Sequence, residues 1–317
     1  MPTSPRTPES ASADEILHRL EWTVLRRLDG LLQGDYRTLY RGSGLDLADL
    51  REYQHHDDVR YIDWNVTARL QTPYVREYDE ARELAGWLLL DLSGSVDFGS
   101  QRITKQSLAR DFCAVLARLL TRRGNRVGAI LYGAGIEAII PARGGRTQVL
   151  QILHRIATRP PAPRSPGTDL GALLAAAQRM MARRSLAFVV SDFLAVPGWE
   201  QALGRLAQRH EIVAVRLVDP LERALPDLGL LVMQDAETGE QLFVDTHERA
   251  LRRRFGQAAG RREQALRASF WRAGVDALEL STDDDLVDAI LRFAELRARR
   301  SRLAAGGGLP ARTGATR

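Results

Sequence analysis

Five oxygen-bearing side chains stand at predicted strand ends and loops of this sequence and could together bind a hard metal cation. Asp91, Ser93 and Ser95 form an Asp-x-Ser-x-Ser motif directly after the most hydrophobic run of the chain. Thr168 follows a proline-rich loop, and Asp192 ends another hydrophobic run. Hydroxyl and carboxylate oxygens suit Mg²⁺, and these loops contain no cysteine or histidine of the kind that binds zinc or copper. We therefore predict a magnesium site formed by these five residues.

The two kinds of side chain have different roles in such a site. Hydroxyl groups of the serines and of Thr168 can bind the ion directly, while Asp91 and Asp192 hold its water ligands or orient the direct ligands. Two carboxylates only balance the charge of a divalent ion, and neither needs to fill its last coordination position. A carboxylate from a partner protein could complete the shell.

The elements that must position these residues alternate between strands and helices. Predicted strands cover 87–93, 126–134, 136–142, 185–193, 211–220 and 276–281, with one hairpin joining 126–134 to 136–142 and another at 228–245. Helical periodicity occupies most of the intervals, starting with a helix from Asp14 to Gly34. Buried strands alternating with helices predict an α/β fold, a doubly wound and mainly parallel sheet of the Rossmann type. Such sheets bind ligands at the carboxyl ends of their strands, where the five residues fall.

Composition divides the chain into four parts. Residues 1–13 are rich in Pro, Ser and Thr and are predicted to be disordered, and residues 301–317 form a glycine-rich, flexible tail. Residues 14–84 are predicted to form a small N-terminal helical and irregular subdomain, and residues 85–300 the α/β domain.

The segment before the metal motif is dense in charged and aromatic residues. One interpretation is a set of salt bridges that ties the subdomain to the sheet, with Trp64 as an apolar anchor. The other is a surface that binds a partner, because Arg, Tyr and Trp are common at the energetic centres of interfaces. The candidates for partner binding are Arg51, Tyr53, Asp58, Arg60, Asp63 and Trp64.

The Asp-x-Ser-x-Ser motif, followed by Thr168 and Asp192, resembles the metal-ion-dependent adhesion site of von Willebrand factor A domains. The resemblance implies Mg²⁺ or Mn²⁺ at these residues and an acidic side chain of a partner in the open position. One departure lies in the third loop, where Phe193 follows Asp192 and many relatives have glycine.

Residues from about 40 to about 245, most strongly residues 44–95, resemble the bacterial family known as domain of unknown function 58 (DUF58). The resemblance depends on Arg51-x-Tyr53, on the string from Asp57 to Trp64, and on Val75-Arg76-Glu77 leading into Asp91. Members of that family join this segment to a von Willebrand A-type domain, and their genes often lie beside MoxR-type AAA+ ATPases. The resemblance implies a partner or co-chaperone of such an ATPase.

Charge and composition bear on the remaining classes of protein. The net charge is +5 and the pI about 9.8, but Lys105 is the sole lysine among 45 basic residues and only 6% of residues are aromatic. This pattern indicates coding bias, and we expect no nucleic-acid binding. The hydrophobic runs are too short to span a membrane, no signal peptide is evident, and Cys113 is the only cysteine, so we expect a cytoplasmic protein.

We expect no enzymatic activity. The sequence contains neither a nucleophile elbow nor a phosphate-binding loop, and Cys113 falls on the apolar face of a predicted helix. Two alternatives stay open: a scaffold that binds through the arginine-rich stretch 249–272 with a purely structural metal, and a metal-assisted hydrolase that uses Asp91 and Asp192.

Overall fold

The structure is a computed structural model. It describes residues 12–31, 49–54, 59, 62, 64–77, 85–100, 103–160, 165, 167–235 and 238–305. The chain forms two compact units. The first contains residues 1–36 and 84–293, and the second contains residues 37–83 and 294–317.

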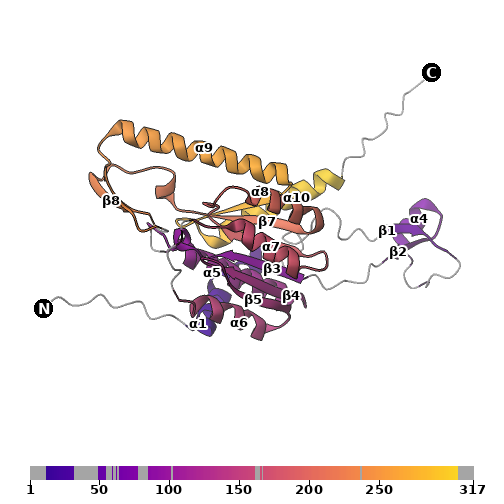
Figure 1. Ribbon diagram of the computed structural model, residues 1–317. Coiled ribbons are helices and arrows are strands. Elements are labelled where there is room, and N and C mark those ends of the chain that lie inside the picture. The colour runs from indigo at the N-terminus through magenta and orange to yellow at the C-terminus, as the bar shows by residue number, and fades with distance from the viewer. Residues whose placement is uncertain are drawn as a thin grey trace, which may run out of the picture. The chain divides into compact units, whose positions relative to one another are not determined.

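A six-stranded sheet forms the centre of the first unit (Figure 1). Its strands are β3 (Ala85–Asp91), β4 (Arg126–Tyr132), β5 (Ile136–Arg143), β6 (Leu186–Ser191), β7 (Glu211–Val218) and β10 (Asp276–Ser281). They lie in the order β10-β7-β6-β3-β4-β5, all parallel except β5, which forms an antiparallel hairpin with β4. This confirms the prediction of a mixed α/β protein with a mainly parallel sheet. β3 and β6 are buried almost throughout, because central strands of such a sheet are covered on both faces.

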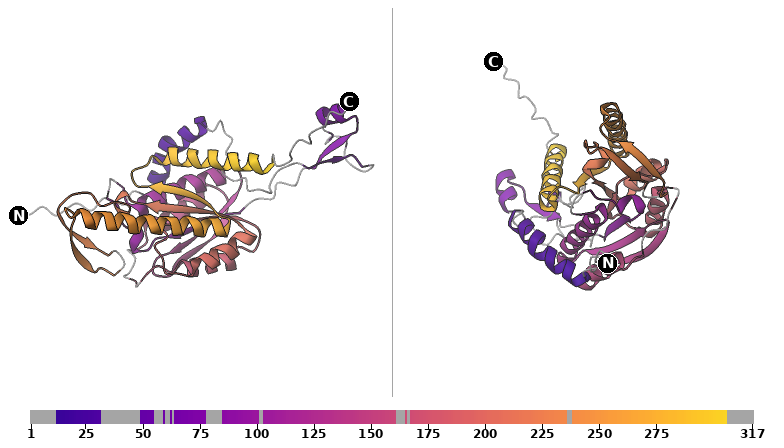
Figure 2. Two further views of the ribbon diagram at one scale, coloured as in Figure 1. Left: turned by 90° about the horizontal axis from the view of Figure 1, so that it is seen from above. Right: turned by 90° about the vertical axis from the view of Figure 1, so that its left-hand side faces the viewer.

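Helices cover both faces of this sheet (Figures 1 and 2). One face carries α5 (Lys105–Arg122) and α6 (Arg146–Ala157), and the other carries α7 (Leu170–Met180), α8 (Trp199–Arg209) and α9 (Arg249–Ala273). On the second face, Trp87 and Leu89 of β3 pack in one hydrophobic cluster with Leu173 of α7 and Phe270 of α9. Cys113 is buried within α5, as its place on an apolar helix face predicts.

The N-terminal helices belong to the sheet unit. α1 (Ala13–Leu20) begins with a capping box made by Ser12 and Glu15, and it continues through a π-helical turn, η1 (Glu21–Leu25), into α2 (Arg26–Leu31). α1 packs against α5 and α6, and Arg118 of α5 donates to Glu21 at 2.7 Å. The expected 14–84 subdomain is thus divided, because its helical part joins the first unit.

The second unit contains a small hairpin and a helix. β1 (Asp49–Glu52) pairs antiparallel with β2 (Tyr74–Glu77), and α4 (Trp64–Leu70) lies between them in sequence. The Tyr74 amide donates to the Thr67 hydroxyl at 3.1 Å, which ties the helix to β2. α10 (Leu286–Ala305) begins in the first unit and ends in the second. No helix among the described residues is both long enough and apolar enough to cross a membrane.

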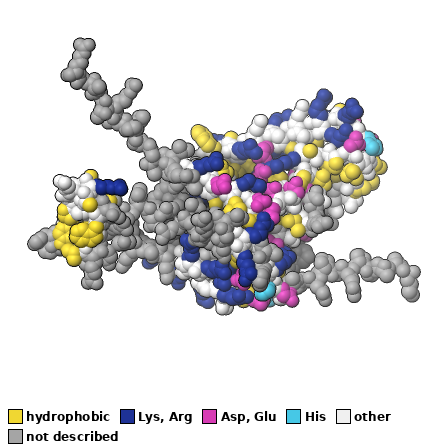
Figure 3. Space-filling view, turned by 180° about the vertical axis from the view of Figure 1, so that it is seen from behind, with side chains coloured by type: hydrophobic (Ala, Val, Ile, Leu, Met, Phe, Trp, Pro, Cys, Tyr) yellow, Lys and Arg dark blue, Asp and Glu magenta, His cyan; other side chains and the backbone are white. Residues whose placement is uncertain are grey.

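A second hairpin, β8 (Leu230–Gln234) and β9 (Gln241–Asp245), confirms the pairing predicted at 228–245. Leu230, Val232 and Phe243 lie on the same face of this hairpin and are 71%, 56% and 70% exposed. Figure 3 shows hydrophobic side chains gathered on this end of the first unit.

Candidate functional site

Three loops meet at the carboxyl edge of the sheet, between the central strands β3 and β6. Successive strands run outward from this point in opposite directions, from β3 to β4 and from β6 to β7, which makes it the topological switch point of the sheet. Asp91 is the last residue of β3, and Asp192 follows the last residue of β6. Thr168, just before α7, is bridged to Ala195, and its carbonyl accepts from the Val196 amide at 2.9 Å.

All five predicted metal-site residues are buried in this region. Their exposed fractions range from zero for Asp91 to 9% for Ser95. The Ser191 hydroxyl, at the end of β6, donates to Asp91 Oδ2 at 2.7 Å, which links the first and third loops. Buried polar side chains at such a density need partners or a ligand.

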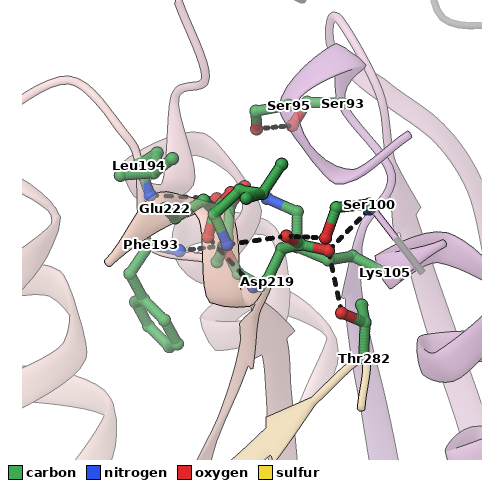
Figure 4. A network of polar contacts seen from close by, with 12 residues as sticks. Ser93, Ser95, Ser100, Lys105, Phe193, Leu194, Asp219, Glu222 and Thr282 are labelled. Carbon is green, nitrogen blue, oxygen red and sulfur yellow. Dashed lines mark hydrogen bonds and ion pairs between the residues drawn. The ribbon is translucent and has the colours of Figure 1, made fainter. Parts of the chain in front are cut away.

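The two serines of the motif face each other, as Figure 4 shows. Ser93 Oγ and Ser95 Oγ are 3.2 Å apart, and the Ser93 amide donates to Asp91 Oδ1 at 3.0 Å. Two neighbouring ligands of an octahedral Mg²⁺ at ~2.1 Å are separated by about 3.0 Å. The hydroxyl pair therefore has the spacing that direct Mg²⁺ ligands require.

Asp91 is a buried carboxylate that forms no ion pair with a lysine or arginine among the described residues. Each of its oxygens accepts one hydrogen bond, from the Ser93 amide and from the Ser191 hydroxyl. Burial raises the pKa of Asp91 to about 6, and the negative charge of Asp192 adds to that rise. A divalent ion would offset both effects, because it favours the charged form.

Asp192 is held by a loop in a strained conformation. Its Oδ1 accepts from the Leu194 amide at 3.0 Å. Phe193, between them, has a φ of 58°, in the left-handed region that favours glycine. Its ring packs against Trp199 and Phe270, with centroids 5.3 and 4.9 Å away. The hydrophobic packing of the ring offsets the backbone strain at Phe193.

Lys105 is a residue of this site that the sequence analysis did not identify. Its side chain is fully buried, and its Nζ donates to Asp192 Oδ2 at 2.7 Å and to Glu222 Oε1 at 2.5 Å (Figure 4). Burial lowers the pKa of Lys105, but the charges of Asp192 and Glu222 outweigh burial and raise the pKa above its ordinary value. The sequence does contain one indication of this residue, because Lys105 is the sole lysine among 45 basic residues. A single lysine kept in so arginine-rich a sequence indicates a specific environment.

A further residue that the sequence analysis did not identify, the carboxylate Asp219, fastens the neighbouring loops. It follows β7 and accepts from the Ser100 amide and hydroxyl at 2.8 and 2.6 Å, and from the Thr282 hydroxyl at 2.8 Å (Figure 4). Burial alone would raise the pKa of Asp219, but the bonds from Ser100, Leu221 and Thr282 lower it. This network joins the loop before α5 to the ends of β7 and β10.

The charges in this region leave room for a divalent cation. Asp91, Asp192 and Glu222 bring three carboxylates, and Lys105 compensates only one of them. Among the described residues, no group of three or more His, Cys, Asp and Glu side chains could hold a metal by itself. Any metal here must accordingly rely on hydroxyl ligands and water, a donor set that fits Mg²⁺ or Mn²⁺ and not a soft ion.

The candidates for partner binding lie in the second unit. Tyr53 is half-buried, whereas Trp64 is 68% exposed. The interpretation of Trp64 as an apolar anchor to the sheet stays a prediction. Asp58, Arg60, Asp63 and the side chain of Arg51 lie outside the described residues.

The first unit is thus a mixed α/β domain with a hydroxyl- and carboxylate-lined site at the switch point of a mainly parallel sheet. The chain belongs to the family described as "Protein of unknown function DUF58", whose model matches residues 49–265. It is 39% identical over 294 residues to the uncharacterized protein Rv1480 of Mycobacterium tuberculosis, covering 92% of this chain and 91% of that protein. An uncharacterized protein of Mycobacterium avium, MAV169, is 38% identical over 162 residues, which are 50% of this chain and 94% of that protein.

Two solved structures resemble the chain at low identity. They are the conserved hypothetical protein BatB from Bacteroides thetaiotaomicron (TM-score 0.44, 13% identity) and an aerotolerance-related membrane protein from Bacteroides fragilis (TM-score 0.45, 12% identity). Each comparison covers 68% of this chain and 99% of the other chain.

Proposed function

We propose that this protein is a non-enzymatic interaction module of the von Willebrand factor A type. It holds Mg²⁺ or Mn²⁺ at Asp91, Ser93, Ser95, Thr168 and Asp192, and it binds a partner through an acidic side chain that completes the metal's coordination. The observation that carries the proposal is the buried Ser93–Ser95 hydroxyl pair, 3.2 Å apart, whose Ser93 amide donates to the buried Asp91. A charge-assisted contact to the ion in a largely dry site would be strong.

The described site favours binding over catalysis. The most obvious base, Asp91, is fully buried and has a hydrogen bond on each oxygen. The ammonium of Lys105 is committed to two carboxylates. Hydrolysis that disappears in Asp91→Ala would overturn this part of the proposal and favour the metal-assisted hydrolase.

The partner that family resemblance suggests is a MoxR-type AAA+ ATPase or its client. The ATPase would supply the energy for assembly or activation, and this chain would hold the acidic residue of the partner. The competing scaffold hypothesis uses α9, where Arg253, Arg254 and Arg261 are exposed. That interface would weaken steeply with salt and ignore a chelator, whereas the metal-dependent interface would be lost on chelation.

Calorimetric titration of Mg²⁺ and Mn²⁺ into the purified protein tests the metal site. We expect saturable binding to one site and a loss of at least about tenfold in affinity when Ser93 and Ser95 are both changed to alanine. Ser185→Ala is the matched control, because Ser185 is equally buried but lies just before β6, at the opposite edge of the sheet. Equal affinity in the wild type and the double variant would remove these hydroxyls from the metal site.

Binding to a MoxR-type ATPase from the same genome tests the partner. We expect the complex to form in Mg²⁺, to dissociate in chelator, and to be lost in the Ser93→Ala/Ser95→Ala variant, as seen by size-exclusion chromatography. A complex that survives chelator but dissociates in moderate salt would support the scaffold hypothesis instead.

A further inference from the structure

A cavity of about 410 Å³ opens beside the metal-motif loop. Ser93 and Gly94 of that loop line it, together with residues from the first turns of α5 and from the C-terminal end of α6. Ser93 therefore belongs to both the candidate metal site and the cavity, so a molecule in the cavity would lie next to the partner's metal-binding acid.

A buried arginine lines this cavity. The Arg159 side chain is only 7% exposed, and its Nε and Nη2 donate to the two carboxylate oxygens of Glu137 at 2.9 and 2.7 Å. With the Gln106 amide oriented to match its neighbours, Arg159 Nη1 donates to the amide oxygen at 3.1 Å, and the amide nitrogen donates to Asp97 at 3.1 Å. The bond from Gln106 satisfies one acceptor oxygen of Asp97, an acidic residue in the cavity lining that keeps its negative charge.

A second arginine adds positive charge that its neighbour compensates only in part. Arg110 lines the cavity, is about a quarter exposed, and donates through Nε to Asp111 at 3.1 Å. Asp111 also accepts a hydrogen bond from Arg19 at 2.7 Å, so its single negative charge is shared between two guanidinium groups. Glu137 already pairs with Arg159, so the positive charge left over at the cavity is that of Arg19 and Arg110 over their shared Asp111, and Arg110 is the lining residue that can bind an anion.

We propose that the cavity is a second acid-binding subsite for the partner that reaches the metal. This inference rests on the proposed function and extends it: the recognised segment carries two acidic side chains, one at the metal and one in the cavity. Guanidinium groups bind carboxylates through paired hydrogen bonds. Arg110 would contact the partner's carboxylate directly, and the buried Arg159 would support the cavity lining.

Synthetic peptides test this pairing. The probes are acetyl-Asp-(Gly)n-Asp-amide with zero to three glycines and acetyl-Asp-Gly-Gly-amide as the one-acid reference, titrated in Mg²⁺ and in chelator with NMR detection. We expect a two-acid peptide of one spacing to bind at least about tenfold more tightly than the one-acid peptide. Arg110→Gln should remove that advantage and leave the one-acid affinity unchanged. Arg155→Gln, an exposed position on α6 outside the cavity lining, is the matched control.

The outcomes separate this inference from the proposed function. If the tighter binding of the two-acid peptide depends on Arg110 but persists in chelator, the cavity subsite is supported and the metal proposal is contradicted. If both peptides bind equally in Mg²⁺, or if Arg110→Gln has no effect, the subsite is overturned and the metal proposal is untouched. Inorganic phosphate that binds in an Arg110-dependent manner and displaces no peptide would also overturn the subsite, because the cavity would then be a phosphate site.

Discussion

Asp91→Asn should abolish binding of Mg²⁺ and yet leave the metal-free protein at least as stable as the wild type at pH 7.5. Asparagine has the shape of aspartate and can keep both contacts: its oxygen accepts from the Ser93 amide, and its nitrogen donates to the Ser191 hydroxyl. The change removes a fully buried charge whose pKa is raised from 3.8 to about 6. At about 1.4 kcal/mol per pKa unit, we expect a gain of up to about 3 kcal/mol in the free energy of unfolding.

The same shift predicts how the stability of the metal-free wild type depends on pH. A raised carboxyl pKa means that the folded protein binds the Asp91 proton more tightly than the unfolded chain does. This contribution to stability is complete below about pH 4 and is lost as the pH rises through about 6. Asp91→Asn should lack this loss, and saturating Mg²⁺ should reverse it in the wild type.

Urea unfolding of both proteins between pH 4 and 8, with and without Mg²⁺, measures these effects. The difference between their pH profiles is the informative quantity, because titrating groups that do not interact with Asp91 contribute equally to both. A variant that is clearly less stable than the wild type at pH 7.5 without metal would show that the Asp91 charge is already compensated. Retention of Mg²⁺ binding by the variant would exclude Asp91 from the metal site.

Lys105→Met should destabilise the protein by about 3–5 kcal/mol, because it leaves Asp192 and Glu222 without their shared cation in a buried site. Methionine fills a similar volume, so the loss reports on charge and not on packing. Because the site then carries one more uncompensated negative charge, Mg²⁺ should stabilise this variant more than it stabilises the wild type.

A set of combined variants separates the ion pairs from other effects. Adding Asp192→Asn and Glu222→Gln to Lys105→Met removes the orphaned charges, and we expect at least half of the lost stability to return in urea unfolding. The Asp192→Asn/Glu222→Gln variant with Lys105 intact is the control, and it should itself be destabilised because it buries an unpaired ammonium. A loss below about 1 kcal/mol for Lys105→Met would mean that the two ion pairs contribute little in solution.

The sequence by itself determined the strands of the sheet, the β4–β5 and β8–β9 hairpins, and the loops that carry the candidate site. Local patterns suffice for these features, because strands buried on both faces require continuous hydrophobic runs. The placement of Asp91 and Asp192 near each other follows from the same reasoning, since parallel strands end at one edge of the sheet. The metal that would bind there stays a prediction.

Only the tertiary structure decided which distant residues complete the site. Lys105 meets Asp192 and Glu222 across 87 and 117 residues of sequence, and Ser100 meets Asp219 across 119. These contacts depend on which turn of α5 lies over the ends of β6 and β7, and no local pattern encodes that. The same limit explains why the N-terminal helices join the sheet unit, because hydrophobic periodicity shows that a face needs a partner but does not show which element provides it.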